Sequence, residues 1–100
     1  MIHELKSWRH FFQAIISGDK VHDLRKNDRG YNVGDVLVLK EYNFENGTYT
    51  GSWCEAVVTY ITDNRTPCAY SSAVLPNDYC ILSLRVRRVE IVKQYEDEAA

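Results

Sequence analysis

Six charged side chains gather within ten residues near the start of the chain, a density suited to binding an anion or a nucleotide. Four are cations and two are carboxylates: Lys20, Asp23, Arg25, Lys26, Asp28 and Arg29. If residues 20–26 form a strand, their side chains alternate between its two faces. Asp23 and Arg25 then share one face, where the guanidinium presents a fork of donors beside an acceptor. The alternative is a solvated hairpin flank in which Arg25 pairs locally with Asp23 or Glu41.

The composition is that of one compact domain. The chain has 100 residues, of which 45% are hydrophobic and 26% are charged, as in folded rather than disordered proteins. We expect a single domain over residues 1–92 and an acidic tail over residues 93–100. The formal net charge of −2 does not attract nucleic acid, so such binding would depend on a local cationic patch.

The cysteines and the opening segment indicate a cytoplasmic location. Cys54, Cys68 and Cys80 are odd in number and spaced by fourteen and twelve residues, which fits neither a disulfide framework nor a zinc site. Free, buried thiols are the prediction. The opening segment has no apolar run long enough for a signal peptide or a membrane span. The sequence therefore predicts a cytoplasmic protein without metal, cofactor or membrane contact.

An aromatic helix is predicted directly before the charged stretch. Residues 2–6 alternate as a short strand, Ser7 is placed to cap a helix, and Gly18 is placed to end it. The apolar side chains of this helix recur at i, i+3, i+4 and i+7 and are predicted to pack in the core: Trp8, Phe11, Phe12 and Ile15.

Strand signals dominate the remaining chain, over residues 36–42, 53–62, 79–84 and 86–92. The last two are expected to form one long strand or two strands joined by a bend. Residues 36–39 form a continuous apolar run, which predicts a strand covered on both faces. Asn46-Gly47 indicates a hairpin with a loop longer than two residues. Tyr60 is expected on the same strand face as Val58. Residues 63–78 are expected to form a functional loop, with one helical turn near residues 69–73.

This order of elements predicts an α+β fold. A short strand, one principal helix and then mostly antiparallel strands would curl into a small, partly closed mixed β-barrel, with the N-terminal helix packed at one end. A barrel of this size has a packed interior. The ligand site is therefore expected on the rim, where the helix meets the first strands.

Several short motifs occur together in the first 42 residues. They are IHELK, an aromatic helix ending in Ser17-Gly18, Lys20 followed by the string RKNDRG, and VGD before an apolar strand with Glu41. This set resembles the ASCH superfamily, and more closely its small phage and bacterial domains of unknown function. The resemblance implies a PUA-like β-barrel with a cleft for RNA or a nucleotide. It implies that the cleft is lined by Lys20, Asp23 and Arg25 and flanked by His3, Lys6, Asn27 and Arg29.

One branch of this superfamily hydrolyses acetylated cytidine with a lysine, a threonine nucleophile three residues later and a glutamate. Lys20 matches the lysine, but Asp23 stands in place of the threonine, and a carboxylate nucleophile would give a labile anhydride rather than an ester. Lys20 and Asp23 are the catalytic candidates if the protein is a small hydrolase of a modified nucleoside or RNA. For RNA cleavage, Lys20 and Arg25 would stabilise a phosphorane while His3 or His22 moves a proton.

Three functions stay open. The first is binding of RNA or a nucleotide, with phosphates held by Arg25, Lys26 and Arg29 and an unpaired base stacked on Tyr31 or a tyrosine of the 63–78 loop. The second is the hydrolase. The third is a phage-type inhibitor or adaptor that binds a host protein. Binding is favoured over catalysis because the sequence contains no complete set of nucleophile, base and oxyanion donors.

Overall fold

The computed structural model describes residues 1–65 and 74–92, which form five strands and one helix. The elements are β1 (Ile2–Trp8), α1 (Arg9–Ser17), β2 (His22–Lys26), β3 (Val36–Asn43), β4 (Thr48–Thr62) and β5 (Tyr79–Glu90). The predicted order is confirmed, and of the two alternatives for the last segment the structure has the one long strand. The helical turn near residues 69–73, the middle of the 63–78 loop and the tail over residues 93–100 lie outside the described residues.

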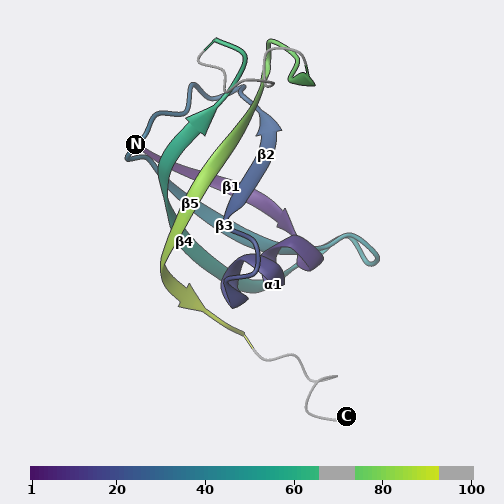
Figure 1. The fold of residues 1–100 in the computed structure, drawn as a ribbon. Helices are drawn as coiled ribbons and strands as arrows, with labels where there is room; N and C mark the ends of the chain where they lie inside the picture. Colours follow the sequence, from purple (N-terminus) through teal and green to yellow (C-terminus); the bar gives the residue numbers. More distant parts are fainter. Residues whose placement is uncertain (66–73, 93–100) are drawn as a thin grey trace.

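The strands form a single mixed sheet of five, in the order β1-β3-β4-β5-β2. β1 pairs with β3 in parallel, and the other pairings are antiparallel. Figure 1 shows this sheet curled on itself, with α1 beside its lower end. The structure thus confirms a small, barrel-like α+β architecture. Within the described residues no strand pairing joins β1 to β2, so these two strands are the edges of the curl.

The helix contributes only part of its apolar stripe to the core. Phe12 and Ile15 belong to the buried cluster, whereas Trp8 and Phe11 are 49% and 43% exposed, so their predicted burial is wrong. The reason is that β1 continues through Trp8 in register with β3, and the helix begins one residue later than predicted. Ser7 is therefore a buried strand residue and does not cap the helix.

The end of the helix is as predicted. Gly18 adopts the left-handed conformation with a φ of 87°, and its N–H donates to the Ile15 carbonyl. Glycine reaches this conformation without a steric penalty, so the chain turns sharply here and enters β2.

β3 buries one face only. Leu37 and Leu39 are fully buried, but the valines that alternate with them are partly exposed, so the prediction of a strand covered on both faces is wrong. Residues 44–47 then connect β3 to β4, and the Gly47 N–H donates to the Asn43 carbonyl. This confirms a hairpin with a loop longer than two residues.

A register shift in β4 changes which side chains face the core. Cys54, Ala56 and Val58 are fully buried, and the pairing of β4 with β5 shifts between Val58 and Tyr60. An extra residue at such a bulge moves the following side chains to the other face. Tyr60 is consequently 58% exposed, contrary to prediction, and Ile61 packs against the core instead.

The two cysteines in the described part of the chain are free and buried, as predicted. Burial raises the pKa of the Cys54 thiol to about 11, and it also raises the pKa of Cys80. Both thiols are therefore protonated and unreactive at neutral pH. Cys68 lies outside the described residues. In residues 1–65 and 74–92, no helix has the length and apolar character needed to cross a bilayer.

Candidate functional site

The two edge strands approach each other along a seam that contains two recesses. The first, here called the aromatic recess, has a volume of about 210 Å³ and is lined by Lys6, Ser7, Trp8, Phe11, Asp23, Leu24 and Arg25. The second, the cationic recess, has a volume of about 320 Å³ and is lined by Leu5, Lys6, Arg25, Lys26, Asp28, Arg29 and Tyr31. Both include Lys6 of β1 and Arg25 of β2. The seam is therefore one site with two compartments.

Arg25 contacts both edges of the seam. Its Nε donates to Oδ2 of Asp23, which lies two residues earlier on the same face of β2, as strand alternation predicts. Its Nη2 lies 3.5 Å from the carbonyl oxygen of Lys6 in β1. Asp23 is buried and Arg25 is partly buried, so the carboxylate holds the guanidinium in place at the seam. These contacts use only part of the donor set of the guanidinium.

Glu41, the other partner considered for Arg25, has different contacts. One carboxylate oxygen accepts a hydrogen bond of 2.6 Å from Gln13 Nε2 of α1, and the other accepts one of 2.6 Å from Thr50 Oγ1 of β4. Glu41 thus fastens the helix to the sheet and is not part of the seam.

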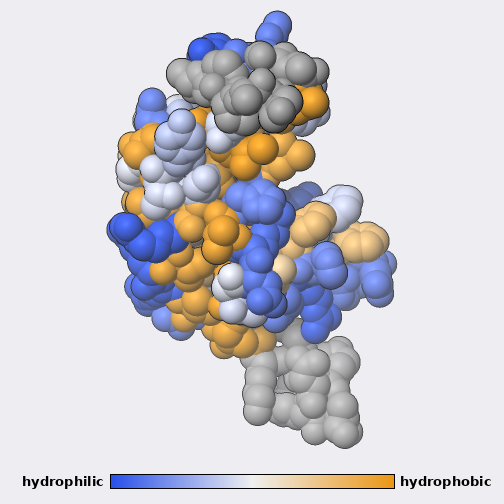
Figure 2. All heavy atoms as spheres, in the orientation of Figure 1, coloured by the Kyte–Doolittle hydropathy of each residue, from blue (hydrophilic) through white to orange (hydrophobic). Residues whose placement is uncertain are grey.

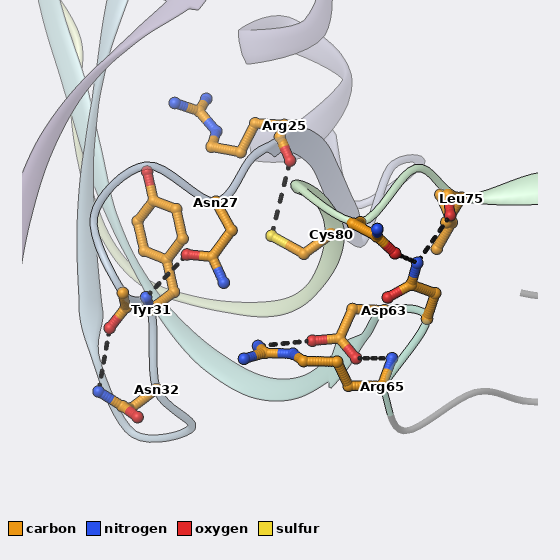
Figure 3. Close-up of polar contacts among 11 residues, drawn as sticks. Arg25, Asn27, Tyr31, Asn32, Asp63, Arg65, Leu75 and Cys80 are labelled. Carbon is orange, nitrogen blue, oxygen red and sulfur yellow. Dashed lines mark hydrogen bonds and ion pairs between the residues drawn. The ribbon is translucent and has the colours of Figure 1, made fainter. Parts of the chain in front are cut away.

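Tyr31 forms the inner wall of the cationic recess. Its ring is 5% exposed and meets the His3 ring edge-on, with centroids 4.9 Å apart. Figure 3 shows the Tyr31 hydroxyl pointing toward the Arg25 side chain, and no group in the described residues completes a hydrogen bond with it. Burial raises the pKa of Tyr31, although Arg25 acts in the opposite direction. A ring enclosed in this way does not stack on a base, contrary to the prediction for Tyr31.

His3 lies behind that wall and lines neither recess. Its Nε2 is 2.9 Å from Oδ2 of Asp35, and both side chains are buried. Asp35 Oδ2 also accepts the backbone N–H of Asn32 at 3.0 Å. The hydrogen bond with His3 is the main reason that the pKa of Asp35 falls to about 2, since burial alone would raise it. His3 and Asp35 therefore hold the segment that carries Tyr31.

Asn27 has a similar supporting position. Its Oδ1 accepts the Tyr31 N–H at 3.2 Å, and its own N–H donates to the Asp78 carbonyl at 2.7 Å. Figure 3 shows Asn27 beside the Tyr31 backbone. Asn27 shapes the loop after β2 but lines neither recess, whereas Arg29 lines the cationic recess.

Lys20 lies at the rim, outside both recesses. Its Nζ is 5.2 Å from the centroid of the Phe11 ring and 3.5 Å from His22 Nε2. The seam thus brings together Lys6, Asp23, Arg25 and Arg29 among the predicted residues, and it leaves out Lys20, His3 and Asn27. Within residues 1–65 and 74–92, no three His, Cys, Asp or Glu side chains group as metal ligands would.

Three exposed aromatic rings, two at the seam and one beside it, were not predicted as site residues. Trp8 is stacked with Phe11 at a centroid distance of 6.2 Å and an interplanar angle of 11°, and its ring lies 5.1 Å from that of Phe44. We call these three residues the aromatic patch. Figure 2 shows apolar surface among hydrophilic surface where α1 and the β3–β4 connection lie. Phe44 could have indicated this patch from the sequence. A large apolar side chain in a hairpin loop is far from the core and therefore stays exposed.

The seam lies within a segment shared with other proteins. Residues 2–84 match the family described as a domain of unknown function, DUF3850. The chain belongs to this family. The chain is also 40% identical, over 62 residues, to the "Uncharacterized 12.9 kDa protein in GpA 3'region" of Escherichia phage P2. That match covers 62% of this chain and 55% of the phage protein, so the chain spans about half the length of this relative. The DUF3850 segment contains both edge strands and therefore both recesses.

Proposed function

We propose that this DUF3850 protein binds RNA or a nucleotide in the seam between β1 and β2. The observation that carries the proposal is the position of Arg25, which is oriented by Asp23 and shared by both recesses together with Lys6. A planar guanidinium held by a carboxylate presents donors in a fixed plane, which suits the oxygens of a phosphate.

The charges of the cationic recess support the same ligand class. Its lining has one carboxylate, Asp28, against four cations: Lys6, Arg25, Lys26 and Arg29. Lys26 Nζ lies 3.6 Å from Asp78, but neither Lys6 nor Arg29 takes part in an ion pair with a described residue. The recess is thus a positive site on a chain whose net charge is −2. Such a local patch attracts phosphates without general affinity for polyanions.

The architecture supports a relationship with ASCH-type, PUA-like domains, which we include in the proposal. The curled mixed sheet, the helix at one end and a cleft formed by the RKNDRG segment agree with the arrangement that the motifs imply. Under this relationship, the family would use its open seam as the ligand cleft.

A hydrolase has less support from the geometry. Asp23 is engaged by Arg25, and Lys20 contacts Phe11 and His22 at the rim rather than Asp23. A lysine and carboxylate acting as a catalytic pair would need to meet at one reacting atom. The seam therefore has the features of a binding site before those of a catalytic one.

The test is fluorescence anisotropy with a labelled single-stranded oligouridylate of roughly ten nucleotides. We expect the affinity to fall linearly with salt on a logarithmic scale, and Arg25→Ala to weaken binding about tenfold or more. Arg88→Ala is the matched control, because Arg88 pairs with Glu90 on β5 and lines neither recess.

Two results would contradict the proposal: equal affinity of Arg25→Ala and the native protein, or an equal loss in Arg88→Ala. Mass spectrometry of the recovered oligonucleotide, and of an N-acylated nucleoside incubated in parallel, shows whether a product forms. A product that disappears in Lys20→Ala would favour the hydrolase instead.

A further inference from the structure

We infer that the aromatic patch is a stacking platform for unpaired bases, so that the ligand of the seam is a single strand rather than a duplex. This inference rests on the proposed function. It concerns the bases of the ligand. Arg25 and Lys6 would contact the phosphates of any nucleic acid and so would not distinguish a single strand from a duplex.

The rings of the patch form one exposed surface. The exposed fractions are 49% for Trp8, 43% for Phe11 and 58% for Phe44, and Trp8 stands between the other two. Single exposed apolar residues are ordinary on protein surfaces, but contiguous ones mark interaction sites. Exposed aromatic rings are the groups on which unpaired bases stack.

The position of the patch relative to the cations identifies its occupant. Trp8 and Phe11 line the aromatic recess together with Lys6 and Arg25, and Lys20 Nζ lies over the Phe11 ring at the rim. A base stacked on Trp8 would therefore place its phosphate beside two cations. An apolar protein segment on the same rings would instead remove those cations from water without compensation. The charge around the patch favours a nucleotide over an apolar partner.

The patch also connects the seam to a further recess. Phe44 borders a space of about 300 Å³ whose lining includes Arg9 of the helix and the neighbouring Glu45. One cation, Arg9, thus lies beyond Phe44, and Lys6 and Arg25 lie at the Trp8 and Phe11 end of the patch. A track of this kind suits a strand of several nucleotides, because successive phosphates find cations while a base between them stacks. A duplex offers no base faces along such a track.

The experiment isolates Trp8 as a fluorescent probe. The chain has two tryptophans, so Trp53→Phe leaves Trp8 as the only one. In this background we expect single-stranded oligouridylate to quench the Trp8 emission. An abasic oligomer with the same number of phosphates should bind about tenfold more weakly, and a duplex of the same sequence should not quench.

Paired variants separate stacking from folding. Phe44→Leu should weaken oligouridylate binding about fivefold or more, whereas Phe44→Tyr, which keeps a ring, should bind as the native protein. Phe44 is suited to this comparison because it lies in a hairpin loop and outside the buried core. Trp8→Leu and Trp8→Phe, measured by anisotropy, give the same comparison at the central ring.

The outcomes distinguish this inference from the proposed function. If the abasic oligomer or the duplex binds as tightly as oligouridylate while Arg25→Ala still weakens binding, the stacking platform is overturned and the phosphate site stands. Equal binding by Phe44→Leu and Phe44→Tyr, together with an unchanged Trp8 emission, overturns it as well. If no oligomer binds the native protein, both proposals are overturned.

Discussion

The middle of the sheet and its open seam are built from different residues and serve different ends. β3, β4 and β5 each have a strand partner on both sides, and they carry fully buried apolar side chains such as Leu39, Val58 and Leu82. The seam lies between two unpaired edges and is lined by charged and aromatic groups. Stability should therefore reside in the middle strands and ligand binding at the edges, and substitutions should separate the two.

The largest effect is expected in the middle of the sheet. Leu82 is fully buried in β5, so Leu82→Ala should lower the free energy of unfolding by about 3 kcal/mol through lost burial and a cavity. Urea denaturation followed by circular dichroism measures this loss. Oligouridylate binding by the folded fraction should be unchanged. A loss below about 1 kcal/mol would show that the middle strands do not dominate stability.

The next effect lies at the junction of the two regions, where Asp35 precedes β3. Its pKa is about 2 in the folded protein, against an ordinary value of 3.8, because His3 bonds to the carboxylate. The stabilisation is therefore complete above about pH 4 and is lost as the pH falls toward 2, by about 2 kcal/mol in all. Stability measured against pH should decline less steeply in Asp35→Asn over this range. Parallel curves would contradict the role given to Asp35.

A smaller effect is expected at the seam itself. Arg25→Lys keeps the charge but removes the planar fork, so oligouridylate binding should weaken about fivefold with an unchanged salt slope. The unfolding free energy should fall by less than about 1 kcal/mol, because the pair with Asp23 is only partly buried. If Arg25→Lys binds as the native protein, charge alone accounts for binding, and the orientation by Asp23 has no function in it.

The smallest effect is expected at Tyr31, which lies between the core of the sheet and the seam. The Tyr31 hydroxyl is buried with no hydrogen-bond partner in the described residues, so Tyr31→Phe should not lower the melting temperature and should raise it slightly. Differential scanning calorimetry checks this. A fall equivalent to about 1 kcal/mol or more would show that the hydroxyl stabilises the free protein.

Local patterns in the sequence predicted much of this fold. The alternation in residues 2–6, the left-handed turn at Gly18 and the shared face of Asp23 and Arg25 all depend on neighbours within a few residues. Pairings between distant strands could not be predicted in this way. Nothing in the local pattern fixes the parallel pairing of Ile2 with Val36, or the register shift that exposes Tyr60, because both depend on how distant strands meet.

The same limit applies to the site. The charged stretch pointed to Arg25 and Asp23, and the family resemblance placed Lys6 beside them. The position of His3 behind the wall follows from the packing of β1 against β3, which the local pattern does not contain. Trp8 fitted a helical stripe because its spacing to Phe12 and Ile15 suits one. Trp8 instead ends a strand, and this position exposes it beside the seam. The helical spacing of the apolar residues does not show this.

Nuclear magnetic resonance of isotope-labelled protein, titrated with oligouridylate, tests the central claim most directly. If the seam is the ligand site, the largest backbone amide shifts will occur in residues 6–8 of β1 and 23–25 of β2, and residues 54–58 of β4 will change little. The largest shifts would instead cluster around Trp53 and Arg88, away from both recesses, if the ligand binds elsewhere. That result, or the absence of any shift, would contradict the account.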